Sequence, residues 1–335
     1  MSEHQFSPRQ VIFAPTAVCN LNCGHCRVDR NRAHGEGILS IEDAKLFLQS
    51  CVDIGIERVG FSGGEPFLAI DFLEGIISKA VELDLYFDRL MTNGVWWNDE
   101  EILTSSIKRI LDAGFDGILA VSLDDWHKQD SAQVCRFFST AASLSGRYDW
   151  FEITSVTNPD GTIPLDRLEQ TAQGLKARLL YVNDKPAAIR DDRADKNRAS
   201  GADDGSGIHI PISIITYSPP ASDTSSWKAE RWFTDDWCEG PGQVLYVHPD
   251  GMVSVCCGFA NESPLLIAGH ISEGASTLFH RARTMPLVRD CYEKGLGTVR
   301  KELEQKGLPF PGKTGDMCQF CAWLCTQELY PSPKK

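Results

Sequence analysis

Short apolar runs alternate with amphipathic stretches along the first two thirds of the chain. Runs typical of buried strands cover residues 11–16, 57–61, 87–92, 117–123, 151–157 and 208–217. Between them, a helical apolar period predicts helices over 40–54, 71–85, 99–113, 131–143 and 164–180. Six strands that alternate with helices indicate an α/β fold with a parallel sheet or barrel.

The pattern changes after residue 217. Residues 183–207 include a long charged stretch with few apolar side chains, which predicts an exposed loop, and residues 219–228 are rich in Ser, Pro and Asp, as in a linker. Two β-rich runs over 243–257 then flank an Asp-Gly turn and predict a hairpin, and residues 275–294 have a helical pattern. We therefore expect a core domain over 1–217, a linker over 218–235 and a second domain over 236–335.

Composition excludes several classes of protein. The net charge of −13 makes nucleic acid a poor partner, because phosphate binding needs a basic surface. No apolar run approaches the roughly 20 residues of a membrane-spanning helix. The N-terminus lacks a secretory signal, so we expect a cytoplasmic protein whose 12 cysteines are reduced thiols.

Three of these cysteines follow the first predicted strand as Cys19, Cys23 and Cys26, with the spacing C-x3-C-x2-C. Three thiolates from one loop can hold three corners of a cubane iron–sulfur cluster and leave the fourth iron open for chemistry. Ordinary buried cysteines are one alternative. A zinc site is another, with His25 as the fourth ligand.

Small polar residues and glycines follow the next three strands. Ser62, Gly63, Gly64 and Glu65 end the second strand, where paired glycines allow close backbone approach to a ligand and the Glu65 carboxylate can bind an ammonium group. A tight strand-to-helix turn is the alternative. Further polar residues at the ends of strands three and four are Thr92, Asn93, Ser122 and Asp124. Small polar residues at strand ends are commonly turn formers, and parallel α/β folds also place their sites on the loops at these ends.

This combination of motifs resembles the radical S-adenosylmethionine (SAM) enzymes over about residues 10–217. The resemblance implies a partial (β/α)6 TIM-like barrel and a [4Fe–4S] cluster on Cys19, Cys23 and Cys26. The open iron would bind SAM, and one electron, from a donor such as flavodoxin or ferredoxin, would release a 5′-deoxyadenosyl radical. His25 stands at the family's aromatic position. The family's later glycine-containing motif is not recognisable in residues 151–159.

The resemblance also implies which residues contact SAM. The family's Gly-Gly-Glu element, here residues 63–65, binds the methionine amino group, and Ser62, Thr92, Asn93, Ser122 and Asp124 occupy neighbouring positions. The run Asp124-Asp125-Trp126-His127 can also place acid–base groups over the substrate. An exposed, capped loop is the alternative for that run.

A second group of cysteines comprises Cys238, Cys256, Cys257, Cys318, Cys321 and Cys325. With the hairpin, it resembles the SPASM or twitch extension of radical SAM enzymes, a small β-hairpin and helix domain. Six cysteines suit one auxiliary [4Fe–4S] cluster, and a structural zinc site is the alternative. The other cysteines, Cys51, Cys135 and Cys291, are isolated in the sequence.

Adjacent residues on a strand point to opposite sides, so Cys256 and Cys257 are not expected to face one cluster. The motif assigns Cys256 as a ligand, together with Cys238, Cys318, Cys321 and Cys325 as candidates. Cys257 is then either an ordinary thiol or a hydrogen-atom donor, as in radical SAM epimerases.

The family implies two classes of substrate. Auxiliary-cluster members modify ribosomally made peptides by cross-linking, oxidation or epimerisation, and others oxidise or epimerise carbohydrates, including aminoglycosides. Only 18 residues precede Cys19, so we expect no separate leader-binding domain. We predict an enzyme of the oxidoreductase or epimerase type that acts on a peptide, with a carbohydrate as the alternative substrate. A non-catalytic iron–sulfur or zinc protein is the alternative from another class.

Overall fold

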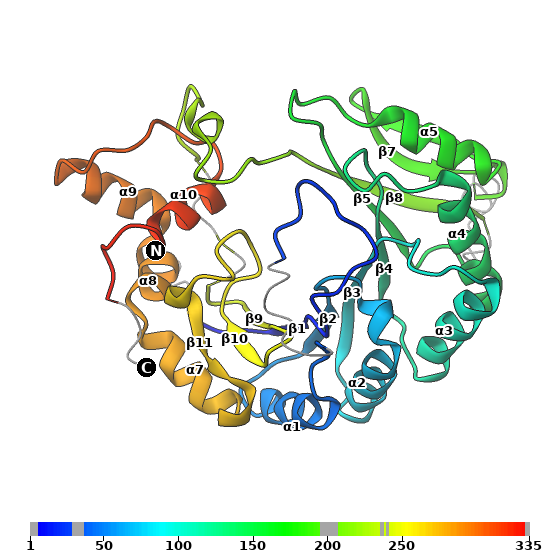
Figure 1. Ribbon diagram of the computed structural model, residues 1–335, viewed down its shortest axis with the longest axis horizontal. Coiled ribbons are helices and arrows are strands. Elements are labelled where there is room, and N and C mark those ends of the chain that lie inside the picture. The colour runs from blue at the N-terminus through cyan, green and yellow to red at the C-terminus, as the bar shows by residue number, and fades with distance from the viewer. Residues whose placement is uncertain (1–5, 29–36, 195–206, 235–237, 239–240, 332–335) are drawn as a thin grey trace.

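A strongly curved sheet forms the frame of the molecule, with helices on its outer side (Figure 1). The computed structural model describes residues 6–28, 37–194, 207–234, 238 and 241–331. The sheet has 11 strands in the order β11-β10-β9-β1-β2-β3-β4-β5-β8-β7-β6. Its first and last strands do not pair, so the sheet stays open.

The parallel part of the sheet confirms the six predicted strands. These six strands, in spatial order, are β1 (Gln10–Phe13), β2 (Arg58–Phe61), β3 (Tyr86–Thr92), β4 (Ile118–Ser122), β5 (Phe151–Val156) and β8 (His209–Ile215). Each of the first five is followed by a helix, and these are α1 (Ile41–Val52), α2 (Ile70–Glu82), α3 (Glu100–Asp112), α4 (Ser131–Ser145) and α5 (Leu165–Gly174). The α/β fold with an unclosed, partial barrel is therefore as predicted.

The helices form where the apolar period places them. The Ser40 side chain accepts a hydrogen bond from the Asp43 backbone N–H and so caps α1. Phe72 on α2 and Phe137 on α4 are fully buried between helices and sheet. Burial of each such side chain stabilises the fold by roughly 1.5–3 kcal/mol.

The region after α5 differs from the prediction. The helix expected over 164–180 ends at Gly174, and β6 (Arg178–Val182) and β7 (Lys185–Arg190) form an antiparallel hairpin beside β8. Asn183 and Asp184 both have positive φ, of 50° and 60°, as a two-residue hairpin turn requires. The loop predicted over 183–207 was therefore wrong for its first part, and residues 195–206 lie outside the described chain.

The C-terminal segment continues the same sheet. Strand β9 (Val244–Val247) pairs in parallel with β1, and it pairs antiparallel with β10 (Met252–Ser254), so the predicted hairpin is confirmed. Strand β11 (Ile267–His270) completes this edge. Residues 219–228 are packed rather than extended, since Trp227 is buried.

Four helices follow β11: α7 (Ala275–Thr284), α8 (Pro286–Arg289), α9 (Leu296–Gln305) and α10 (Met317–Leu324). A π-helical turn over Asp290–Lys294 joins α8 to α9. The single helix predicted over 275–294 is interrupted at Met285, because Pro286 lacks the N–H that would continue α7.

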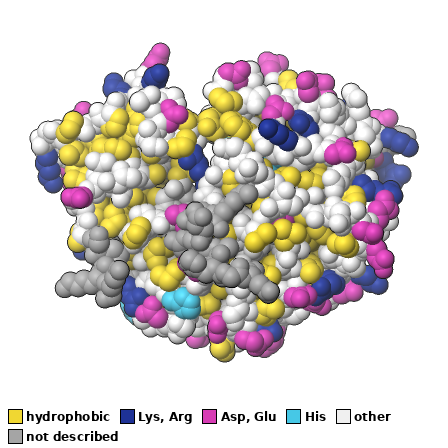
Figure 2. Space-filling model, viewed as in Figure 1, with side chains coloured by type: hydrophobic (Ala, Val, Ile, Leu, Met, Phe, Trp, Pro, Cys, Tyr) yellow, Lys and Arg dark blue, Asp and Glu magenta, His cyan; other side chains and the backbone are white. Residues whose placement is uncertain are grey.

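Figure 2 shows apolar side chains gathered over the C-terminal segment, at the upper left, and acidic ones along the opposite edge. None of the helices in the described part of the chain is long and apolar enough to cross a membrane.

Candidate functional site

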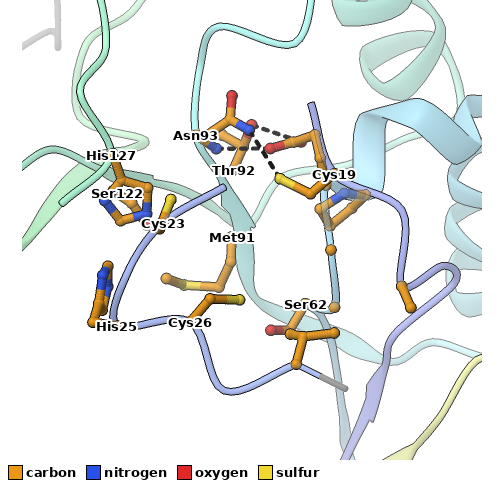
Figure 3. A pocket seen from close by; sticks show the side chains of 16 residues that line it. Cys19, Cys23, His25, Cys26, Ser62, Met91, Thr92, Asn93, Ser122 and His127 are labelled. Carbon is orange, nitrogen blue, oxygen red and sulfur yellow. Dashed lines mark hydrogen bonds between the residues drawn. The ribbon is translucent and has the colours of Figure 1, made fainter. Parts of the chain in front are cut away.

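A cavity of about 160 Å³ lies at the carboxyl ends of the first parallel strands, where the fold predicts a site. Figure 3 shows the side chains that line it. All the predicted cluster-loop and SAM residues except Asp124 are among them: Cys19, Cys23, His25, Cys26, Ser62, Gly63, Gly64, Glu65, Thr92, Asn93 and Ser122. Met91 and His127 also line the cavity.

The three thiols of the cysteine loop face this cavity. The Cys19 sulfur accepts hydrogen bonds from the Leu21 backbone N–H at 3.4 Å and from Asn93 Nδ2 at 3.7 Å, and such donors stabilise a thiolate ligand. Burial raises the pKa of the Cys19 thiol, so these donors and a bound cation both favour the thiolate.

The spread of the three sulfurs fits a cluster better than zinc. A tetrahedral zinc site brings its sulfur ligands to roughly 3.8 Å from one another, because Zn–S bonds measure about 2.3 Å. Among the described residues, the one group of three or more ligand atoms within 4.8 Å of one another is His25, Asp124 and His127. At least one pair of the loop sulfurs is therefore more than 4.8 Å apart, which is wider than a tetrahedral zinc site.

The glycine pair after β2 packs against the start of the cysteine loop. The Gly64 N–H donates to the Thr16 carbonyl and the Glu65 N–H donates to the Val18 carbonyl, both at 2.8 Å. A Cβ atom at Gly64 would lie 2.1 Å from the Val18 oxygen, and Gly63 has a φ of +116°. No other residue fits here, so the pair positions the cysteine loop as well as lining the cavity.

Glu65 connects β2 to β3 beneath the cavity and is 1% exposed. Its Oε1 accepts hydrogen bonds from the Phe67 N–H at 3.2 Å and from Thr92 Oγ1 at 2.9 Å. Burial raises the pKa of the Glu65 carboxyl to about 7, although these hydrogen bonds oppose the shift. The carboxyl group is thus fixed in the cavity wall and poised near neutrality.

Asp124 does not line the cavity, because it is fully buried behind His127. Its Oδ1 accepts hydrogen bonds from the Trp126 and His127 backbone N–H groups and lies 2.7 Å from His127 Nδ1. Its Oδ2 accepts one from the Val156 N–H at 3.2 Å. Asp124 therefore orients His127 and, with its oxygens so engaged, is placed to act on SAM only indirectly.

His127 lies in the cavity wall within hydrogen-bond contact of Cys23. Burial lowers the pKa of His127, but Asp124 and Cys23 outweigh that effect and raise the pKa to about 9. The sequence placed His127 in a group of possible acid–base residues, and its contact with the cysteine loop depends on the fold of the whole sheet.

His25 packs its ring 5.4 Å from the Trp126 ring and 5.0 Å from the His127 ring. Burial lowers the pKa of His25, which favours the neutral imidazole. The His25 ring thus packs against the Trp126 and His127 rings at the edge of the cavity. Its buried Nδ1 has no hydrogen-bond partner.

The second group of cysteines lies between the β9–β10 hairpin and α10. Gly258 donates its N–H to the Cys256 sulfur at 3.3 Å, and the Phe259 backbone donates to the Cys318 sulfur. A Cβ atom on Gly258 would lie 3.3 Å from the Cys318 sulfur and 3.9 Å from the Cys256 sulfur. Cys318 also occupies the first turn of α10, where thiolates are favoured. This donor set fits a metal centre bound through thiolates.

Cys291 also belongs to this group, which corrects the view that it is isolated. It is buried in the π-helical turn, and its thiol lies beside that of Cys321. Cys321 in turn contacts Cys325. Cys238 and Cys256 lie near enough to Cys291 to interact electrostatically with it. Cys291 and Cys321 are 30 positions apart (321 − 291), so no spacing rule reveals that they lie together.

Cys257 is exposed whereas Cys256 is buried, so the two adjacent side chains have different surroundings. Cys257 lines two further cavities, of about 570 and 220 Å³, together with Ser62 and Tyr246. Ser62 also lines the cavity of the cysteine loop, and its hydroxyl bonds to the buried Tyr246 phenol. Tyr246 lines both of these cavities but was not predicted from the sequence, because the residues around it have the pattern of an ordinary strand.

Three comparisons bear on this site. Residues 13–149 match the family model of the Radical SAM superfamily. A probable GTP 3′,8-cyclase of Methanococcus maripaludis is 31% identical over 127 residues, which are 38% of this chain and 40% of that protein. The S-adenosylmethionine-dependent nucleotide dehydratase RSAD2 of Oncorhynchus mykiss is 29% identical over 171 residues, 47% of this chain and 46% of that protein. The chain thus spans less than half the length of these relatives.

Among solved structures, Streptococcus suis SuiB bound to S-adenosylmethionine covers 93% of this chain, and 77% of SuiB is covered in return. The sequence identity is 15% and the TM-score is 0.49. The matched region of the family model begins at the end of β1 and contains the cysteine loop, the glycine pair and the polar ends of β3 and β4. Residues 13–149 of the chain therefore carry a domain of the radical SAM superfamily.

Proposed function

We propose that this protein is a peptide-modifying radical SAM enzyme that inverts a stereocentre, with Cys257 as the hydrogen-atom donor. One observation carries this proposal: the exposed Cys257 thiol lines two cavities that share Ser62 with the cavity of the cysteine loop. A substrate bound next to Ser62 would then have the cysteine loop on one side and the Cys257 thiol on the other, as inversion requires.

Cys19, Cys23 and Cys26 would hold the [4Fe–4S] cluster, and Glu65 would accept a hydrogen bond from the amino group of SAM. When bound, the cluster and SAM supply the 5′-deoxyadenosyl radical that removes a hydrogen atom from the substrate. Thr92 donates a hydrogen bond to the Glu65 carboxyl group, and the Asn93 side chain donates one to the Cys19 sulfur. These contacts would hold the cluster and SAM in fixed positions relative to each other. His127, oriented by Asp124, closes the wall beside Cys23.

The contacts among the C-terminal sulfurs support a choice of auxiliary-cluster ligands. Cys321 is chosen over its neighbours Cys291 and Cys325, because Cys318 and Cys321 have the C-x2-C spacing of a ligand pair. Four cysteines then remain as ligands of one auxiliary [4Fe–4S] cluster: Cys238, Cys256, Cys318 and Cys321. A zinc site is disfavoured, because no three described C-terminal sulfurs lie within 4.8 Å of one another.

The S–H bond of Cys257 breaks, its hydrogen atom forms a C–H bond on the substrate carbon radical, and a thiyl radical remains. One electron from an external donor, of the flavodoxin or ferredoxin class, and one proton from water restore the thiol. Cys257 can serve this role because it is accessible and is separated from the buried Cys256.

The test is anaerobic reconstitution with iron and sulfide, followed by SAM, dithionite and a set of substrates in deuterated water. The set contains short peptides of L-residues and, separately, aminoglycosides. We expect 5′-deoxyadenosine together with one deuterium on an inverted peptide carbon. Inversion of a sugar carbon would favour the carbohydrate alternative. Absence of 5′-deoxyadenosine would contradict catalysis altogether and leave a non-catalytic metal protein.

A further inference from the structure

The larger of the two cavities that Cys257 lines runs along the strands of the sheet. Its volume is about 570 Å³, within the range of roughly 300–1,000 Å³ that is typical of ligand sites. Ser62 and Met91 line this cavity and also the cavity of the cysteine loop (Figure 3), whereas Arg9 and Arg58 line it at the other end of the strands. The larger cavity, called the bore below, therefore extends from the cysteine-loop cavity to the amino ends of β1 and β2.

The alternation of side chains along β1 shows on which side of the sheet the bore lies. Gln10 and Ile12 line the bore, while Val11 and Phe13 are fully buried. Phe13 packs against Phe72 of α2, with 5.9 Å between the ring centres. Because successive residues of a strand point to opposite sides, the bore lies on the side of the sheet away from the helices.

Ion pairs engage two of the three arginines that line the bore. Arg9 Nη1 lies 3.1 Å from Glu57 Oε1, and Arg89 Nε lies 2.9 Å from Glu152 Oε2. The guanidinium groups of Arg9 and Arg89 are therefore balanced by carboxylates of the chain itself.

Arg58 differs from these two arginines. Its side chain is exposed and lines the bore, and the described residues give its guanidinium group no hydrogen bond, ion pair or ring contact. The carboxylate of Asp88 in the same bore accepts a hydrogen bond from Gln10 at 2.6 Å and lies 3.6 Å from Arg89. Arg58 thus presents a planar fork of N–H donors to the bore, a geometry that matches a carboxylate.

The position of Arg58 sets a distance along the bore. Arg58 begins β2 and Ser62 directly follows the strand, four positions later (62 − 58). At about 3.3 Å per residue, this interval measures roughly 13 Å. An extended peptide rises by the same amount per residue, so a carboxylate bound at Arg58 would lie about four residues from a carbon held next to Ser62.

We propose that Arg58 binds a carboxylate group of the substrate, about four residues of extended chain from the carbon that loses its hydrogen atom. This inference rests on the proposed function, which places the reacting carbon next to Ser62. The ligand is an Asp or Glu side chain of a peptide, or its C-terminal carboxylate. A two-point hydrogen bond at this distance fixes the register of the peptide and so selects the residue that is modified.

The binding test uses the reconstituted protein with SAM and ten-residue peptides of Ala and Ser, acetylated and amidated at their ends, with one central Glu or Gln. We expect calorimetry to show about tenfold tighter binding of the Glu peptide, and Arg58→Gln to remove this difference. Arg58→Glu should instead prefer a peptide with Lys at that position. A peptide without Glu but with a free C-terminal carboxylate tests the second source, and tighter binding of this acid than of its amide would support the site.

The matched control is Arg9→Gln, because Arg9 lines the same end of the bore but is paired with Glu57. It should keep the preference for the Glu peptide. Equal affinities for the Glu and Gln peptides in the parent protein would overturn the proposal, and so would an equal loss of preference in Arg9→Gln. Thermal unfolding of each variant shows that the exposed Arg58 side chain can be replaced without loss of the fold.

Turnover in deuterated water tests the spacing. Glu is placed at successive positions of the peptide, and mass spectrometry locates the residue that takes up deuterium. We expect the labelled residue to lie about four positions from Glu and to move with it, and Arg58→Gln to raise KM with little change in kcat. A labelled position that ignores the position of Glu would overturn the proposed spacing.

The two measurements separate this inference from the proposed function. If Arg58 selects the Glu peptide but no peptide takes up deuterium, inversion of a peptide is wrong and the carboxylate site stands. If peptides take up deuterium but the Glu and Gln peptides bind alike, only the role of Arg58 is wrong.

Discussion

Asn93 donates its backbone N–H to Glu65 Oε2 at 2.8 Å and thereby joins the end of β3 to the turn after β2. The same Asn93 reaches the Cys19 sulfur with its side chain. One residue thus connects the carboxyl group proposed to bind SAM with a proposed cluster ligand. Burial raises the pKa of Glu65 to about 7, so the charge of its carboxyl group changes with pH near neutrality.

SAM binding is expected to tighten as the pH rises from 6 to 8. The pKa of Glu65 is about 7, so the carboxylate that accepts a hydrogen bond from SAM forms across this range. The affinity changes by at most about tenfold per pH unit. Calorimetric titration of the reconstituted protein checks this, and Glu65→Gln should abolish the pH dependence while Glu42→Gln on the surface of α1 keeps it. An equally steep profile in Glu65→Gln would assign the titration to another group.

The same shift affects folding. The folded-state pKa of Glu65 lies above its ordinary value of 4.5, so the folded protein binds the proton more tightly than the unfolded chain. The stability contributed by the neutral carboxyl is present below pH 4.5 and is lost as the pH rises through 7. Urea unfolding at pH 5 and pH 8 should therefore differ less in Glu65→Gln than in the parent protein.

Gly64→Ala is expected to remove the SAM-binding cluster. Its Cβ atom would stand 2.1 Å from the Val18 carbonyl, so the cysteine loop must move away from the turn after β2. Iron content after reconstitution should fall to that of the auxiliary cluster, and SAM binding should be lost. Gly315→Ala is the control, because its Cβ atom would meet nothing closer than 3.9 Å. Full iron content in Gly64→Ala would show that the loop tolerates the displacement.

Asp124→Asn is expected to lower the free energy of unfolding by about 1–3 kcal/mol, because an amide nitrogen replaces a buried oxygen acceptor. Asp124 holds the backbone of Trp126, His127 and Val156 together. The adjacent Asp125→Asn should cost much less, since Asp125 is on the surface. Urea unfolding of the two variants measures the difference. Equal losses would mean that Asp124 does not organise this loop.

Cys257→Ala is expected to stop inversion of the substrate while 5′-deoxyadenosine is still formed. The thiol is exposed, so its removal leaves the core intact. Deuterium uptake from deuterated water at the substrate carbon, measured by mass spectrometry, should disappear. Cys135→Ala, a buried thiol on α4, should retain inversion. Continued inversion by Cys257→Ala would rule this thiol out as the donor.

Local patterns predicted much of this protein. Period-two and helical apolar runs gave the six parallel strands and the helices between them, because each such element must bury one side. The spacing of Cys19, Cys23 and Cys26 indicated a cluster loop, since ligands from one short loop need no partner from elsewhere. The β6–β7 hairpin was missed although Asn183 and Asp184 are suited to its turn.

Contacts between distant segments followed only from the folded chain. Cys291 meets Cys321, and Ser62 meets Tyr246, across intervals that carry no periodic signal. Asp124 turned out to support His127 from behind the cavity wall, because burial and backbone donors engage its oxygens. Spacing can reveal ligands that share a loop or a helix. Groups brought together by packing of separate elements depend on the sum of many weak contacts, which no single stretch of the chain encodes.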